Sequence, residues 1–92
     1  MKDTIKTLHP ENKQGVKISR EKYDVIRNAI LCVLHAEKEI TFMNLSRAVE
    51  KELHGKFEGS VTWYVTTVKL DMEARGELKR VHHSRPQLVR LV

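Results

Sequence analysis

Apolar residues recur with a helical period in three stretches of the 92-residue chain, and the last stretch is the most regular. Its stripe, whose members fall on one side of a helix, consists of Val61, Tyr64, Val65, Val68 and Met72. Ser60 is a favourable N-cap just before this stripe, and Gly76 stands where helices commonly end in a left-handed residue. The pattern therefore predicts a helix over residues 60–75.

Two earlier stretches predict helices over residues 19–37 and 41–53. Ser19 and Thr41 suit the N-cap positions of these helices. The face predicted to be buried in the second helix comprises Phe42, Leu45, Ala48, Val49 and Leu53. Residues 54–59 contain two glycines and provide a turn. The chain therefore reads as helix, turn and helix after an initial long helix.

The helix over residues 19–37 carries two adjoining apolar faces. One face comprises Tyr23, Ile26, Ile30, Val33 and Leu34, and the other comprises Val25, Ala29, Cys32 and Ala36. One helix of a three-helix domain is not easily enclosed on every side, so the second face favours a homodimer contact through this helix or its neighbours. The alternative is that the other helices and the N-terminal segment cover it. In so apolar a stretch, Cys32 is expected to be a buried and inert thiol.

The two ends of the chain lack a helical period. Residues 1–18 contain Pro10 and Gly15 and are interpreted as a basic arm, which is either a solvated tail or a segment that contacts phosphate or a partner subunit. After Gly76, the segments LKRVHH and QLVRLV predict a β-hairpin. Residues 39–41 are long enough only for a short bridging strand.

The order of helix, glycine and basic hairpin, read as EARGELKRV followed by QLVRLV, resembles the second half of a winged helix-turn-helix domain. With the earlier helices included, the resemblance extends over residues 19–92. It implies an α+β fold with three helices, a C-terminal β-hairpin wing and a short bridging strand. Residues 60–75 would be the recognition helix and residues 78–92 the wing. The resemblance further implies a small transcription regulator of bacterial type that binds double-stranded DNA.

Within this resemblance, DNA contacts are expected from the recognition-like helix and the wing. The candidate residues are Thr62, Trp63, Thr66, Thr67 and Lys69 in the helix, and Lys79, Arg80, His83, Arg85 and Arg90 in the wing. No helix candidate can make the bidentate contact to guanine that strong base readers make, so sequence-specific recognition is expected to be weak. The wing is expected to contribute phosphate contacts, with Arg85 beside Pro86 in the turn as the best candidate.

The same helix also supports a second hypothesis, a winged-helix module that binds protein without sequence-specific DNA binding. Trp63, Thr67, Leu70 and Ala74 lie together on the side opposite the apolar stripe. A partly apolar outer face with a tryptophan suits a protein contact or a dimer, unless the wing or the N-terminal arm folds over it.

Composition adds a basic balance to this picture. The chain carries 17 Lys and Arg against 12 Asp and Glu, for a net charge of +5. Residues 1–20 contribute +3 and residues 77–92 another +3, whereas the helical body over residues 21–76 carries −1. This distribution makes an acidic partner such as nucleic acid plausible. The length fits one domain, and the absence of a long apolar run or a secretory leader, with a single cysteine, favours the reducing cytoplasm.

Neither catalysis nor metal binding is expected from the sequence. His82 and His83 are adjacent on a predicted strand and point to opposite faces, and Cys32 has no second cysteine to pair with, so we expect no metal and no cofactor. No catalytic motif is present. Asp71 and Glu73 are interpreted as a solvated helix face rather than a carboxylate pair. An enzyme is therefore not expected.

Overall fold

The computed structural model describes residues 3–11, 13–81 and 86–92. Over these residues the chain forms a small α+β domain with three helices and two small antiparallel sheets. The elements are β1 (Thr4–Lys6), β2 (Lys17–Ser19), α1 (Arg20–Glu37), β3 (Glu39–Thr41), α2 (Phe42–Leu53), α3 (Val61–Ala74), β4 (Leu78–Arg80) and β5 (Leu88–Leu91). The α+β class and the three helices agree with the expectation from the sequence.

Each helix begins at the residue after its predicted N-cap. The capping bonds run to the Ser19 hydroxyl from the Lys22 amide at 3.4 Å, to Thr41 from Asn44 at 3.1 Å, and to Ser60 from Trp63 at 3.2 Å. Each bond satisfies one backbone donor that the first helical turn leaves free. Gly76 follows α3 with φ of +80°, a conformation that glycine adopts without strain. The local helix signals were therefore sufficient to fix the helix boundaries.

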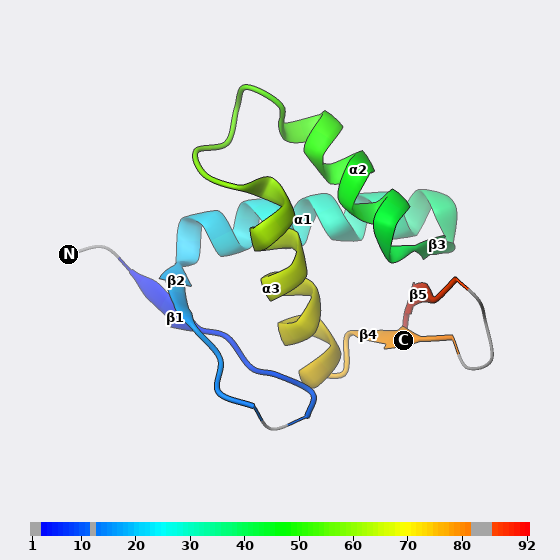
Figure 1. Ribbon diagram of the computed structural model, residues 1–92, viewed down its shortest axis with the longest axis horizontal. Helices are drawn as coiled ribbons and strands as arrows, with labels where there is room; N and C mark the ends of the chain where they lie inside the picture. Colours follow the sequence, from blue (N-terminus) through cyan, green and yellow to red (C-terminus); the bar gives the residue numbers. More distant parts are fainter. Residues whose placement is uncertain (1–2, 12, 82–85) are drawn as a thin grey trace.

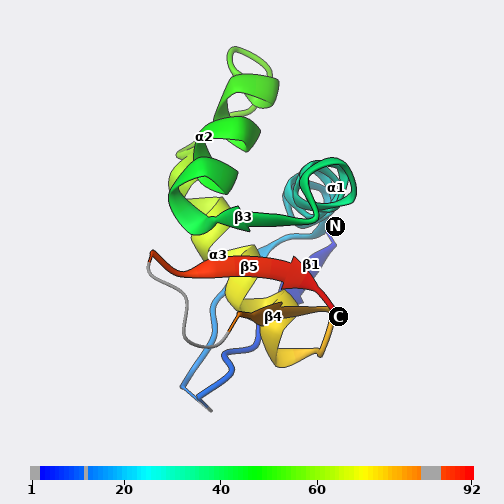
Figure 2. The same cartoon turned by 90° about the vertical axis from the view of Figure 1, so that its right-hand side faces the viewer.

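Two layers of helix enclose the core. Figure 1 shows α2 and α3 crossing in front of α1, and Figure 2 shows the same two layers from the side. The molecule measures 44 × 32 × 18 Å. Helix α1 alone forms the rear helical layer, behind α2 and α3. The fully buried side chains include Ile26 and Ile30 of α1, Leu45 and Val49 of α2, and Val65, Val68 and Met72 of α3. These residues belong to the predicted stripes. The other members of those stripes that are only half-buried are Val33, Phe42, Ala48, Leu53, Val61 and Tyr64.

The C-terminal strands lie in a three-stranded sheet of order β3-β5-β4. Val89 in the central strand pairs with Ile40 of β3 and Arg80 of β4. Val89 itself is completely buried, which anchors the sheet to the core. The short strand at residues 39–41 therefore bridges to the C-terminal hairpin, as the sequence indicated.

The N-terminal segment is a docked β-hairpin rather than a solvated tail. Strands β1 and β2 pair with Ile5 opposite Ile18, and Ile18 is buried against the core. The Thr7 amide donates to the Val16 carbonyl at 2.8 Å. A Cβ at Gly15 would lie 1.7 Å from the Thr7 carbonyl oxygen, so only glycine permits this approach.

The second apolar face of α1 is open. Val25, Cys32 and Ala36 are exposed, so neither α2, α3 nor the N-terminal hairpin covers them. Ala29 is half-buried and packs against the core. The expectation of a buried Cys32 is therefore wrong, because the residue lies on the side of α1 that faces away from both other helices. In the described residues, no helix is both long and apolar enough to span a membrane.

Candidate nucleic-acid interface

The outer face of α3 is uncharged. It comprises the exposed residues Thr62 and Trp63 and the half-buried residues Thr66, Thr67 and Leu70. Trp63 is 46% exposed, which agrees with its predicted outward position. The Thr66 hydroxyl donates to the Thr62 carbonyl at 3.0 Å, one turn earlier. Its oxygen can still accept a hydrogen bond, and its methyl group is available for apolar contact.

Every charged side chain within α3 is instead turned inward. These residues are Lys69, Asp71 and Glu73, and each is buried or nearly so at its side chain. A helix with these charges on its outer side would present two carboxylates to a partner. The inward arrangement removes both of them from the exposed surface.

Lys69 does not occupy the position expected of a DNA contact. It is only 5% exposed, and its ammonium pairs with Glu73 one turn later. The same ammonium lies 5.2 Å from the centre of the Phe42 ring, a favourable cation–π position. The structure therefore corrects this assignment, because reaching a phosphate would require breaking a buried pair.

The cations of the C-terminal hairpin differ in whether a carboxylate of the same chain already pairs with them. Arg80 is held by Glu73 at 3.3 Å, and Arg90 lies 3.6 Å from Glu39 across the β3–β5 pair. Both arginines remain about half-exposed, and Lys79 is also exposed. In the β4–β5 register, Lys79 lies opposite Arg90, so these two cations share the outer face of the sheet. His83 and Arg85 lie outside the described residues.

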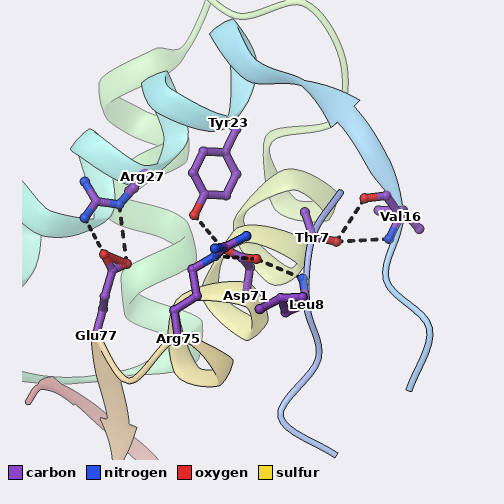
Figure 3. Close-up of polar contacts among 8 residues, drawn as sticks. All are labelled: Thr7, Leu8, Val16, Tyr23, Arg27, Asp71, Arg75 and Glu77. Carbon is purple, nitrogen blue, oxygen red and sulfur yellow. Dashed lines mark hydrogen bonds and ion pairs between the residues drawn. The ribbon is translucent and has the colours of Figure 1, made fainter. Parts of the chain in front are cut away.

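Asp71 is the central residue of a polar network that joins three elements (Figure 3). Its carboxylate accepts a hydrogen bond from the Tyr23 hydroxyl of α1 and another from the Leu8 amide of the N-terminal hairpin, at 2.8 Å. Arg75 donates to both carboxylate oxygens at 3.0 and 2.9 Å. The interpretation of Asp71 and Glu73 as a solvated face is therefore wrong. Asp71 is fully buried and fixes α3 against α1 and the hairpin.

A second ion pair lies beside this network. Arg27 of α1 donates to Glu77 at 2.5 and 3.4 Å, just before β4 (Figure 3). The hydrogen bond to Glu77 raises the pKa of Arg27, and the bond to Asp71 raises the pKa of Arg75 in the same way. Burial, with the hydrogen bond to Asp71, raises the pKa of Tyr23 to about 12. The Tyr23 phenol therefore keeps its proton to a higher pH than a free tyrosine does.

An aromatic group supports the N-terminal end of α3. Tyr64 packs edge-to-face against Phe57 and Trp63, with ring centres 5.1 and 4.9 Å apart. The Lys22 ammonium of α1 lies within 6 Å of the Phe57 and Tyr64 ring centres. These contacts hold Trp63 in a defined orientation while leaving almost half of it open to solvent.

Sequence reasoning missed the residues that organise this surface. Tyr23, Asp71 and Arg75 are distant in sequence or lie at the edge of the apolar stripe, so periodicity alone does not connect them. In a helical projection Asp71 does lie beside Tyr64 and Val68, at the edge of the apolar stripe, and this was the available signal. Within the described residues, no three metal-binding side chains come together.

The fold and the surface define a small α+β domain that presents an uncharged helix face between two hairpins. Residues 4–89 match the family described as "Family of unknown function (DUF6958)", so the chain belongs to that family. Neither the curated proteins nor the solved structures contain a match.

Proposed function

We propose that this protein is a winged-helix domain that binds double-stranded DNA, with α3 in the major groove and the β4–β5 hairpin as the wing. The observation that carries the proposal is the uncharged outer face of α3, from which both carboxylates of the helix are withdrawn. DNA repels carboxylates strongly, whereas hydroxyl and methyl groups fit base edges and the thymine methyl. The proposed role in transcription regulation rests on the resemblance of the sequence to winged helix-turn-helix domains.

The order of elements supports the winged-helix interpretation. Helices α2 and α3 follow one another through a turn, and β3, β5 and β4 form a sheet beside the end of α3. In winged-helix domains this arrangement brings the second helix of the pair and the hairpin to one side of the molecule. Figure 1 is compatible with that geometry, because β4 and β5 lie beside the C-terminal end of α3.

The distribution of polar groups favours backbone contacts over base recognition. With Lys69 buried, no lysine or arginine lies on the outer face of α3. Thr62 and Thr66 are suited to a phosphate or a base edge, and Lys79 to a phosphate. Binding should therefore depend steeply on salt and only weakly on base sequence.

A second candidate function is a protein contact through the same face. Trp63 is almost half-exposed and is held rigidly by Tyr64, as in the aromatic anchors of protein interfaces. This candidate needs no phosphate contact, so the two functions differ in their response to salt.

The experiment compares binding of labelled duplexes of unrelated sequence over a salt series, by fluorescence anisotropy. Thr66→Glu adds a carboxylate to the outer face of α3 and should weaken binding by at least about tenfold. Val92→Glu adds the same charge at the exposed end of the chain, which lies on the α1 side in Figure 2. That control variant should bind as the wild type does.

The two candidates give different results. Each cation that neutralises a phosphate should add about −0.9 to the slope of log K against log salt, and Lys79→Ala should remove about one such unit. Absence of binding at low salt would reject the DNA proposal and favour the protein contact. An equal loss in both Glu variants would show that net charge, rather than this face, determines binding.

A further inference from the structure

The outer face of α1 has an arrangement of side chains that is complementary to itself. From one end to the other it carries Glu21, Val25, Asn28, Ala29, Cys32, His35 and Ala36, all exposed except the half-buried Ala29. Glu21, Asn28 and His35 are seven residues apart, so they form one row along the helix. An acid stands at one end of this row and an imidazole at the other.

We infer that this face is the contact surface for a second copy of the same chain, in an antiparallel helix pair about a twofold axis near Asn28 and Ala29. In this register, Glu21 of each copy faces His35 of the other. Val25 faces the opposite Cys32, because both lie equally far from the axis.

The end groups favour this orientation over the parallel one. A parallel pair would bring the two Glu21 carboxylates together, whereas the antiparallel pair places each carboxylate opposite the His35 imidazole, whose N–H can donate a hydrogen bond to it. An unrelated partner has no reason to match a surface with this internal symmetry. A second copy matches this face because Glu21 and His35 lie equally far from its centre, so each can pair with the other residue of the second copy.

The shape of the domain leaves this face without a partner inside the chain. The slab is 18 Å thick, and α1 is the only helix on its rear side, with α2 and α3 on the other. A domain of 92 residues buries a modest fraction of its surface, so covering four apolar positions adds useful stability. The contact is about 20 Å long, from 14 steps of 1.5 Å, which is at the small end of stable interfaces. We therefore expect a weak, concentration-dependent dimer.

Disulfide trapping tests the register. In the antiparallel pair, two Cys32 residues are offset by roughly 10 Å along the helices, too far for a disulfide, whereas positions 25 and 32 are level. Oxidised Val25→Cys should therefore form covalent dimers on a denaturing gel. The wild type and the double variant Val25→Cys/Cys32→Ala should remain monomeric under the same oxidation.

Two results would overturn the proposal. Covalent dimers of the wild type, or of Val25→Cys/Cys32→Ala, would indicate a parallel or different contact. Absence of covalent dimers in folded Val25→Cys would mean that the face does not associate in this register. Val25 is 38% exposed, so the substitution should leave folding intact, which circular dichroism checks.

Sedimentation equilibrium provides a second test without oxidation. Over about 1 µM to 1 mM protein, the wild type should pass from monomer to dimer. Asn28→Arg, at an exposed residue, puts two like charges at the axis and should remain monomeric throughout. The matched control is Met43→Arg, at an apolar residue of α2 that is 62% exposed, and it should dimerise as the wild type does. Monomeric wild type at the highest concentration would reject the proposal.

The dimer also affects the proposed DNA binding, on which this last step rests. Because α3 and the outer face of α1 lie on opposite sides of the slab, the dimer directs its two α3 helices away from each other (Figure 2). One dimer would then join two duplexes. Oxidised Val25→Cys should capture a second duplex on DNA-coated beads, and the reduced protein should lose this capture while keeping single-duplex binding. Failure to bind even one duplex would reject the DNA proposal and leave the dimer test unaffected.

Discussion

The two sides of α3 differ in charge and in what they contact. On the inner side, Asp71 and Lys69 are buried beside partners from other elements, and these contacts fix the position of the helix. On the outer side, the Thr66 hydroxyl donates a hydrogen bond to the Thr62 carbonyl within the same helix. The charges of α3 therefore serve its own fold, and its outer face presents hydroxyl, apolar and aromatic groups.

This division has a physical reason. A buried carboxylate is tolerated only where several donors replace its lost water, and Asp71 has Tyr23, Leu8 and Arg75. These three donors come from α1, the N-terminal hairpin and the C-terminal end of α3. One carboxylate therefore sets the relative positions of three elements.

The inner side should respond most strongly to loss of its central acceptor. Asp71→Ala leaves the Tyr23 hydroxyl and the Leu8 amide without their acceptor. We expect the free energy of unfolding to fall by about 2 to 4 kcal/mol, measured by urea titration. A loss below about 0.5 kcal/mol would mean that water replaces the carboxylate freely and that the network does not hold the helix.

Alkaline pH should weaken the same side through Tyr23. Its pKa is raised to about 12 in the folded state from an ordinary value of 10.0, so the fold favours the neutral phenol. This contribution is complete below pH 10 and is lost as pH rises from 10 to 12. Across that range, the wild type should lose about 2 to 3 kcal/mol more stability than Tyr23→Phe, measured by urea unfolding at each pH. Parallel curves for the two proteins would contradict the network.

The apolar part of the inner side should show a somewhat smaller effect. Val68 is completely buried, and Val68→Ala removes two methyl groups from the contact between α3 and the other helices. The expected loss is roughly 1 to 3 kcal/mol, seen as a lower melting temperature. An unchanged melting temperature would mean that the packed stripe lies elsewhere on α3.

The outer side should tolerate substitution with the smallest change in stability. Thr66→Ala removes a hydroxyl that binds only its own helix, so the free energy of unfolding should stay within about 0.5 kcal/mol of the wild type. Urea titration of this variant beside Asp71→Ala provides the direct comparison of the two sides. A loss similar to that of Asp71→Ala would show that the outer face also supports the fold.

Much of the fold could be predicted because its signals are local. N-caps at Ser19, Thr41 and Ser60 and the stop at Gly76 act over one helical turn, and each is where the sequence indicated. The N-terminal hairpin could not be predicted in this way. Its stability depends on Ile18 reaching the core and on the Leu8 amide reaching Asp71, 63 positions away.

The candidate surface was predictable only in part. The outward direction of Trp63 followed from helical period, and it is confirmed. The positions of Lys69, Asp71 and Glu73 did not follow, because a charged residue at the edge of an apolar stripe can turn either way. Which way it turns depends on whether another element supplies a partner.

The sequence by itself determined where the helices begin and end, which stripes are buried and how the basic residues are divided between the two ends of the chain. Those features depend on neighbours within a few residues. Only the tertiary structure decided that the charges of α3 face inward and that Cys32 lies on an open face of α1. Both outcomes depend on donors, acceptors and apolar surface that come from distant parts of the chain, and such partners are brought together only by the packing of the whole domain.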